Sequence, residues 1–254
     1  MIKIEKIIHG TPLITIWFAD KEISDKGIVV YNESQSEFSG ATEFVTLVSD
    51  LTLSKEELLG KCVQNCRYEV RRAYRENVEV VMMDSKQIKD EDISTFLEFF
   101  ESFWKSKNIS FDTKSSLNEE LIAYRNAGAL YITQAVIDDE IAVYHTYIGD
   151  DTRIRLLHSA SLYRLNSDTD GSKKNLIGMA NRMLHIEDMY YFKDAGLEVY
   201  DWGGAGTAED VAGITKFKKS FGGEQVVFYS GQAVNGFKAK AVNALSKMKH
   251  IIKK

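Results

Sequence analysis

The sequence predicts an α/β (α+β) protein whose mixed, mainly antiparallel sheet is flanked by helices. Segments rich in β-branched and aromatic residues alternate with amphipathic helical segments along the chain. Three strand-like segments, 130–137, 141–148 and 153–162, follow one another through short turns, as in an antiparallel meander. With 44% hydrophobic and 27% charged residues among its 254, the chain has the composition of an ordinary globular protein.

The first 50 residues predict short strands. Segments 13–18, 27–31 and 43–48 are rich in β-branched and aromatic residues. Gly40 and the polar stretch 20–25 supply turns between them.

After residue 53 the spacing of the apolar residues changes to that of a helix. Ser54 and Glu57 form a capping box, and the helix is expected to run to Asn77. Its apolar face has spacings of four and three residues and consists of Leu58, Cys62, Cys66, Val70 and Ala73. A strand at 78–82 and a second amphipathic helix at 91–105 follow.

The second half of the chain predicts a further helix, the meander and an alternation of helices and strands. After a helix at 117–127 and the meander, the polar loop 166–172 opens a long helix at 173–195, which Gly196 ends. The remaining elements are a strand at 197–200, a glycine turn at 203–206, a short helix at 214–220 and a strand at 225–230.

The net charge of the chain excludes a positive electrostatic field over the whole protein that would attract nucleic acid. Lys and Arg number 32 and Asp and Glu 37, so the net charge is −5. The segment 237–254 is an exception, because it has six lysines and no acid. It is either a basic helix that meets tRNA, a lipid-linked precursor or a peripheral anionic surface, or a docked helix with a solvated lysine face. The docked helix would pack through the stripe Phe237, Ala241, Leu245, Met248 and Ile252.

The two cysteines, Cys62 and Cys66, predict core packing. A disulfide between successive helical turns would close almost no loop, and zinc would need two further ligands that no second Cys/His pair provides. We therefore predict no metal. The N-terminus has no signal-peptide pattern and no apolar run approaches the ~20 residues of a membrane span, so we expect a cytoplasmic protein.

Two stretches resemble the FemABX-like branch of the GNAT-like acyltransferases. The segment 67–78, RYEVRRAYRENV, is similar to the pattern R-Y-x-I-R-R-A-x-R-E-G-V, with Asn77 at the position of the glycine. The segments 200–204, YDWGG, and 213–223, GITKFKKSFGG, look like the pair Y-D-F-G-G and G-I-x-x-F-K-x-x-F-G-G. The resemblance covers about residues 51–230 and implies a GNAT-like sheet flanked by helices.

The resemblance also implies a domain division and a reaction. The chain is expected to comprise a truncated N-terminal GNAT-like subdomain at 1–85, a GNAT-like acyltransferase domain at 86–235 and a basic C-terminal helix at 236–254. The implied reaction is the direct transfer of an acyl group from acyl-CoA (acetyl-CoA) to an amine. The acceptor would be a small metabolite or a cell-envelope precursor.

The donor site is expected at the start of the long helix. Backbone N–H groups and the helix dipole favour anions there, and lysines in a first turn are otherwise unfavourable. The candidates for binding the donor are Lys173, Lys174, Asn175, Gly178 and, within the second motif, Lys216. An exposed lysine pair without a ligand is the alternative.

The catalytic candidates are Asp201, Lys218 and His145. Asp201 follows a buried strand, and either serves as a base or caps the glycine turn. Lys218 fits the lysine of the second motif, for which the resemblance implies donor contact or transition-state stabilisation. His145 on the meander would suit proton removal at neutral pH, or is simply hydrogen-bonded.

The candidates for substrate binding are Arg67, Arg71, Arg164 and Trp202. Arg67 and Arg71 belong to a stack with Arg75, which either meets a phosphorylated acceptor or pairs with nearby glutamates. Two readings compete with the acyl-CoA-dependent enzyme. One is an aminoacyl-tRNA-dependent transferase, and the other is a non-catalytic binding module with the same fold.

Overall fold

A computed structural model describes residues 1–164, 171–206 and 209–252. The chain divides into two compact units. The smaller comprises residues 1–46 together with the segment from Val226 onward, and the larger comprises Leu47–Gln225. No helix among the described residues is long and apolar enough to span a membrane.

The smaller unit is a four-stranded sheet with a helix. Its strands lie in the order β1-β2-β3-β10, and β2 and β3 are parallel while the outer pairs are antiparallel. The elements are β1 (Ile2–Ile8), β2 (Thr11–Trp17), β3 (Gly27–Ser34), β10 (Glu224–Asn235) and α7 (Phe237–Ile252). The helix α7 packs through Ala239, which is 2% exposed, whereas Phe237 is 91% exposed. The predicted packing stripe is therefore wrong at its first two residues, since Ala241 is exposed as well, and on the neighbouring face Lys238 Nζ donates to Gly10 O.

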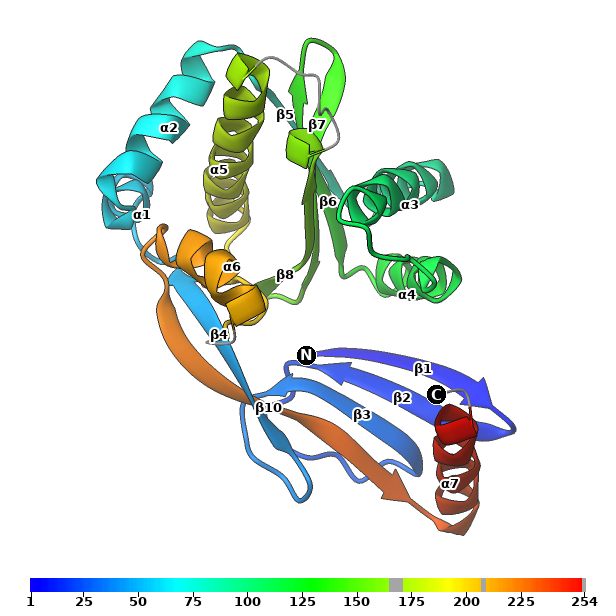
Figure 1. Ribbon diagram of the computed structural model, residues 1–254. Helices are drawn as coiled ribbons and strands as arrows, with labels where there is room; N and C mark the ends of the chain where they lie inside the picture. The colour runs from blue at the N-terminus through cyan, green and yellow to red at the C-terminus, as the bar shows by residue number, and fades with distance from the viewer. Residues whose placement is uncertain (165–170, 207–208, 253–254) are drawn as a thin grey trace. The chain divides into compact units, whose positions relative to one another are not determined.

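The larger unit is a mixed sheet with helices on both faces (Figure 1). Its strand order is β4-β9-β8-β7-β6-β5, with β8 and β9 parallel and the other pairs antiparallel. The strands are β4 (Thr42–Asp50), β5 (Glu79–Asp84), β6 (Leu130–Ile137), β7 (Glu140–Gly149), β8 (Arg153–Ser161) and β9 (Val199–Asp201). The predicted meander is β6, β7 and β8, and its first turn uses the positive φ angles of Asp138 and Asp139.

Two groups of helices cover this sheet. Helices α1, α2 and α5 lie on one face and α3 and α4 on the other (Figure 1). Their bounds are α1 (Lys55–Lys61), α2 (Gln64–Arg75), α3 (Asp90–Lys105), α4 (Lys114–Asn126), η1 (Leu162–Arg164), α5 (Gly171–Asp194) and α6 (Glu209–Lys219). The α5 face holds the main core, in which Phe192, Tyr147 and Trp202 are completely buried. This mixed, mainly antiparallel sheet flanked by helices confirms the predicted fold class.

The helix predicted from Ser54 to Asn77 is two helices. Cys62 has extended backbone angles and separates α1 from α2. The guanidinium of Arg67 donates to the carbonyl oxygens of Gly60 and Cys62, and Val63 N–H donates to Ser220 O at 2.9 Å. The Arg67 bonds satisfy two carbonyl groups at the break, and the Val63 bond satisfies an N–H group that a continuous helix would have paired internally. Both cysteines are buried, as predicted.

The compact units differ from the division predicted at residues 85 and 235. Helices α1 and α2 pack with α5 inside the larger unit, through apolar residues such as Val70 and Ile186. The segment from Val226 instead joins the smaller unit, where β10 pairs with β3. The smaller unit therefore combines both ends of the chain.

Candidate functional site

The sheet of the larger unit opens where β8 and β9 part. In the described residues β9 pairs with β8 at three positions, from Arg153↔Val199 to Arg155↔Asp201. Strand β8 continues to Ser161, which still pairs with Val143 of β7 on the other side. Ligands of α/β sheets commonly bind beyond the ends of strands, where neighbouring strands diverge.

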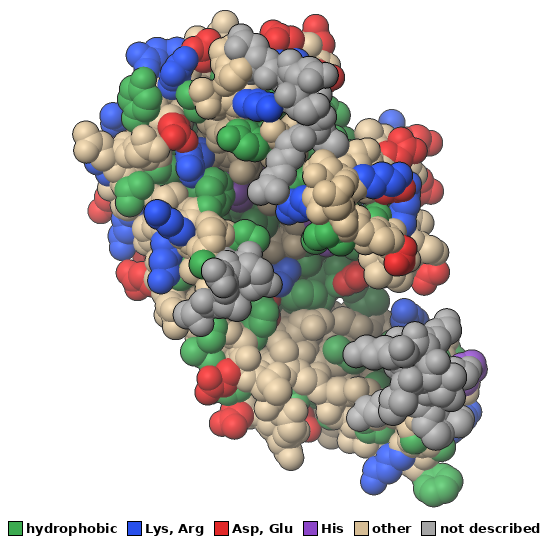
Figure 2. All heavy atoms as spheres, in the orientation of Figure 1, with side chains coloured by type: hydrophobic (Ala, Val, Ile, Leu, Met, Phe, Trp, Pro, Cys, Tyr) green, Lys and Arg blue, Asp and Glu red, His purple; other side chains and the backbone are tan. Residues whose placement is uncertain are grey.

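A cleft of about 380 Å³ lies at this opening. Its size falls within the range typical of small-molecule sites. Figure 2 shows this face of the larger unit, which is hollowed between α3 on one side and α5 and α6 on the other. The cleft walls include Glu69, Asn175, Gly178, Asn181, Arg182 and Phe217.

One wall carries a paired guanidinium with a spare donor. Arg182 Nε donates to Glu69 Oε2, and the guanidinium stacks 4.7 Å from the centre of the Phe217 ring. The other carboxylate oxygen of Glu69 accepts from Asn65 Nδ2 at 2.7 Å. Arg182 Nη1 is buried and has no acceptor in the described part of the chain.

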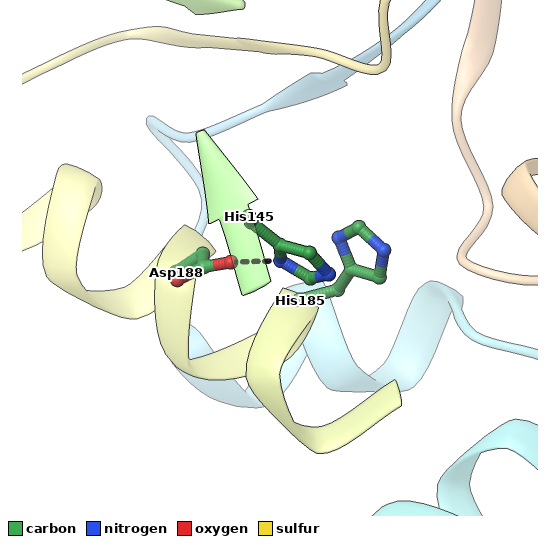
Figure 3. Close-up of side chains that lie close together, drawn as sticks. All are labelled: His145, His185 and Asp188. Carbon is green, nitrogen blue, oxygen red and sulfur yellow. Dashed lines mark hydrogen bonds and ion pairs between the residues drawn. The ribbon is translucent and has the colours of Figure 1, made fainter. Parts of the chain in front are cut away.

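The floor of the cleft rests on a buried dyad. His145 Nε2 lies 2.9 Å from Asn181 Oδ1, and His145 Nδ1 lies 2.8 Å from Asp188 Oδ2 (Figure 3). His145 and Asp188 are both fully buried. His145 is thus held between the Asn181 amide, which faces one ring nitrogen, and the Asp188 carboxylate, which faces the other.

The carboxylate of Asp188 is the terminus of a second chain of donors. Tyr147 O–H donates to the same Oδ2 atom. Tyr147 O then accepts from Tyr200 O–H at 2.8 Å, and Tyr200 O accepts from His185 Nδ1–H at 2.9 Å. This is the arrangement in which each of these hydrogens has an acceptor.

The protonation of the chain follows from its burial. Burial, and then the charge of Asp188, raise the pKa of Tyr147 well above its usual value. Burial and the same charge also raise the pKa of Tyr200. Burial, and then the neighbouring His145, lower the pKa of His185 well below its usual value. The two tyrosines therefore stay protonated and His185 stays neutral near pH 7.

His145, His185 and Asp188 also form a cluster of potential metal ligands, with ligand atoms within 4.8 Å of one another. The two imidazole rings stack at 4.0 Å between centres with 26° between their planes (Figure 3). Imidazole nitrogens bind a metal at about 2 Å within the plane of the ring, so stacked rings cannot converge on one ion. The hydrogen bonds described above account for the cluster instead.

Of the residues predicted to bind the donor, Asn175 and Gly178 line the cleft, and the predicted catalytic residue His145 lies directly beneath it. A Cβ atom added to Gly178 would meet only the Tyr163 ring, at 3.9 Å, so the helix presents open space there. Lys173 lies apart from these residues, because its Nζ pairs with Glu140 at 3.2 Å. Lys174 lies half-buried in the first turn of α5.

Asp201, Lys218 and Trp202 lie outside the cleft. Asp201 is buried, pairs with Arg153 and accepts from Gly203 N–H at 2.8 Å, which favours the turn-capping alternative. Lys218 Nζ donates to the carbonyl oxygens of Gly203 and Gly204 at 2.9 and 2.7 Å. Both residues thus hold the glycine turn.

The indole of Trp202 is completely buried and donates to Ser49 Oγ at 3.0 Å, so it contacts protein rather than solvent. Lys216 is exposed on α6.

The arginine stack forms a separate open groove on α2. Arg67, Arg71 and Arg75 line it together with Gln64 and Tyr68, around about 530 Å³. The nearby glutamates are engaged elsewhere, Glu69 with Arg182 and Glu76 with Arg72. The backbone of Arg164 ends η1, and its side chain lies outside the described residues.

Sequence reasoning missed Asn181, His185 and Asp188 on α5, and Arg182 beside them. The first three have spacings of four and three and therefore share one face of the helix. Polar residues at the positions of a buried stripe are the signal that could have identified them. The pairing of these residues with His145 could not be predicted from the sequence, because it depends on which face of β7 meets α5.

The larger unit, with its meander, long helix and diverging parallel strands, has a GNAT-like fold similar to that of FemX. No family model matches the sequence, and a search of curated proteins finds no match. Among solved structures, FemX matches with a TM-score of 0.59 and 13% identity over 73% of this chain and 61% of that chain. L-PGS from Bacillus licheniformis matches with a TM-score of 0.52 and 12% identity over 87% of this chain and 72% of that chain.

These likenesses show the fold. The chain spans about three fifths of the FemX structure.

Proposed function

We propose that the protein is an N-acyltransferase that moves an acyl group from acyl-CoA directly to an amine. One observation carries the proposal. The cleft brings the guanidinium of Arg182 and the amide of Asn181 together with the carboxylate of Glu69. Acyl transfer needs donors for a developing oxyanion and an acceptor for the proton of the amine.

The carbonyl oxygen of the donor would lie against Arg182 and Asn181. His145 is hydrogen-bonded to Asn181 through one ring nitrogen and to Asp188 through the other, so the Asn181 amide keeps one orientation. Donors that are fixed before the reaction stabilise the negative charge of a tetrahedral intermediate without reorganisation. His145 is then a positioning residue, because it acts through Asn181.

The amine would lie against Glu69. A carboxylate attracts the ammonium form of the acceptor and takes one proton from it, which frees the nitrogen lone pair, and this proton is released to solvent. The nitrogen then attacks the carbonyl carbon, the C–N bond forms, the C–S bond of the thioester breaks, and the second proton passes from the nitrogen through Glu69 to the departing thiolate. Glu69 is held on both oxygens, by Arg182 and Asn65, so its position is fixed.

The donor would lie along the start of α5. Asn175 and Gly178 line the cleft, and the open space at Gly178 allows a chain to pass close to the helix backbone. We propose Lys173, Lys174 and the N–H groups of the first helical turn as contacts for the donor phosphates. The acceptor would be a small metabolite or a cell-envelope precursor with an amine.

Calorimetric titration with acetyl-CoA tests the proposal. We expect micromolar binding that Gly178→Leu abolishes, because the leucine side chain would fill the cleft. Lys173→Ala/Lys174→Ala should weaken binding through loss of the phosphate contacts. Gly60→Leu is the matched control, because Gly60 is an exposed helical glycine with nothing within 4 Å of an added Cβ. Absence of binding, or equal effects of both leucine variants, would exclude the acyl-CoA proposal.

The arginine groove on α2 favours a second candidate, an aminoacyl-tRNA-dependent transferase. Glu69 of the cleft lies on the same helix as Arg67, Arg71 and Arg75, so a polyanion held in the groove would lie near the cleft. This candidate predicts affinity for tRNA that falls steeply with salt. It also predicts that the double variant Arg71→Gln/Arg75→Gln binds tRNA more weakly than the wild type. If neither acetyl-CoA nor tRNA binds, a non-catalytic binding module is favoured.

A further inference from the structure

Helix α7 is attached to the smaller unit through one of its sides. Ala239 is buried, and Asn243, one turn further along the helix, accepts a hydrogen bond from Gln232 Nε2 of β10 at 3.1 Å. Lys238 Nζ donates to Gly10 O, in the turn between β1 and β2, at 2.7 Å. Figure 1 shows α7 beside the strands of this unit. These contacts determine which side of the helix faces the sheet and which side faces solvent.

The side of α7 that faces solvent is apolar. Phe237 is 91% exposed, and Ala241 and Ala244 are exposed as well. Spacings of four and three residues place these three residues in one row, on the side of the helix opposite Ala239. In the sequence the same spacings continue with Met248 and Ile251. The helix therefore turns this apolar row away from the sheet, where the row adds nothing to the core.

Lysines border the apolar row on both sides. The helical period places Lys238 on one side of the row and Lys240 on the other. In the sequence, Lys249 follows Lys238 by about three helical turns and Lys247 follows Lys240 by about two, so the pattern repeats. A helix whose apolar side is bordered by lysines is typical of segments that lie in the plane of a membrane surface.

The charge of the chain is divided unequally between the two units. The smaller unit has ten lysines and seven acidic residues, whereas the larger unit has 22 lysines and arginines and 30 acidic residues. A positive surface attracts anionic lipid headgroups. Nucleic acid would attract the same lysines, but its bases bind by stacking on aromatic rings, which Ala241 and Ala244 lack. The apolar row therefore favours a bilayer over nucleic acid.

We propose that α7 binds the surface of an anionic lipid bilayer. Phe237 inserts below the headgroups, and the lysines on both sides of the apolar row lie among the lipid phosphates. The surface belongs to the smaller unit and includes no residue of the acyl-transfer cleft, so the proposal does not depend on the proposed reaction.

Co-sedimentation of the full chain with vesicles tests the proposal. The vesicles consist of phosphatidylcholine with about one third phosphatidylglycerol, and vesicles of phosphatidylcholine alone are the reference. We expect saturable binding to the anionic vesicles, weak binding to the reference, and affinity that falls as salt is added. No binding to the anionic vesicles, or equal binding to both, would overturn the proposal.

A substitution in the apolar row tests insertion. Phe237→Ala should bind the anionic vesicles about tenfold more weakly, because the ring no longer leaves water. Ile214→Ala is the matched control, since Ile214 is 52% exposed on α6 of the larger unit, and its affinity should equal that of the wild type. Unchanged affinity of Phe237→Ala would show that the lysines adsorb without insertion, which contradicts the proposal.

A pair of lysine substitutions tests the charge. Lys240→Gln/Lys247→Gln should bind about tenfold more weakly, because each lysine near an anionic surface adds to the affinity. Lys86→Gln/Lys105→Gln changes the net charge equally at two exposed positions of the larger unit and should bind as the wild type does. Equal losses in the two double variants would show that only the total charge matters, and would overturn the assignment to α7.

A tryptophan in place of Phe237 reports its surroundings directly. The emission of Phe237→Trp, measured against the wild type, should shift to shorter wavelength when anionic vesicles are added, and an unchanged emission would contradict insertion. A parallel titration with tRNA separates the two polyanions. Tighter binding of tRNA than of vesicles, lost in Lys240→Gln/Lys247→Gln, would assign α7 to nucleic acid and overturn the proposal.

Discussion

His145 Nδ1 lies 2.8 Å from Asp188 Oδ2, and neither side chain is exposed to solvent. One oxygen of Asp188 is hydrogen-bonded to His145 Nδ1 and accepts from Tyr147 O–H, while its second oxygen is buried with no partner among the residues that the structure describes. The carboxylate thus stabilises the floor of the cleft from below. Its removal would leave two buried donors without their acceptor.

Asp188→Asn is expected to lower the free energy of unfolding by about 3 kcal/mol, because removing one partner of a buried pair leaves the other uncompensated. Denaturant unfolding measures this loss. Asp194→Asn is the control on the same helix, since Asp194 forms an exposed pair with Lys55 and should cost below about 1 kcal/mol. Similar losses in both variants would show that the dyad is not a stabilising unit.

Arg182→Lys is expected to lower the rate of acyl transfer about 100-fold, with a smaller effect on the KM of the donor. The lysine keeps a positive charge but loses the planar, forked donors of the guanidinium, which is proposed to act on the developing oxyanion. Release of coenzyme A from acetyl-CoA with a panel of amines measures the rate. Arg72→Lys should leave it unchanged, because Arg72 pairs with Glu76 on the surface. A rate that survives Arg182→Lys would remove Arg182 from the proposed mechanism.

Acid is expected to destabilise the protein through its buried histidines. The pKa of His158 is about 4 in the folded chain and 6.5 in the unfolded one, so the unfolded chain binds more protons between these values. Stability therefore falls as the pH drops from about 6.5 to about 4, and the lowered pKa of His185 acts in the same direction.

His158→Asn should flatten this dependence by up to about 1.4 kcal/mol per pH unit. Unfolding curves between pH 4 and pH 7 measure the slope, and His9→Asn, an exposed substitution, should leave it unchanged. A slope that is the same in His158→Asn and the wild type would contradict a neutral buried His158.

Gly203→Ala is expected to lower the free energy of unfolding by at least about 3 kcal/mol. The residue has a φ of +69°, and a Cβ atom would lie 2.2 Å from the carbonyl oxygen of Leu156, so strain and overlap add. Gly196 has a φ of +90° with nothing within 4 Å, and Gly196→Ala should cost about 1–2 kcal/mol. Thermal unfolding of both variants separates the backbone strain from the overlap with Leu156. Equal shifts in melting temperature would contradict the close approach of β8 to the glycine turn.

The order of elements could be predicted from the sequence, and their lateral packing could not. The capping box of Ser54 and Glu57, the turn at Asp138 and the left-handed Asn77 depend on neighbouring residues, and the structure has each of them. The break at Cys62 depends on Arg67 and on Ser220 in a distant segment, so the continuous apolar period of the helix concealed it.

The candidate site was predicted in part for the same reason. Asn175 and Gly178 follow from the position of a helix start, and they do line the cleft. Asp201 and Lys218 stand in the matched motif, yet both bind the glycine turn, because a motif also preserves the residues that shape a loop. The pairing of His145 with Asp188 joins positions 43 residues apart and needed the packed structure.

The chain of donors from His185 through Tyr200 and Tyr147 ends at a single acceptor, so it has one direction. Rotation of either tyrosine hydroxyl would break the hydrogen bond that it donates and disturb the one that it accepts. The hydrogens of both tyrosines therefore keep fixed directions. Such a chain resists inversion in the way a row of aligned dipoles does. The interior of the larger unit thereby has a permanent polarisation directed at Asp188, beneath the cleft.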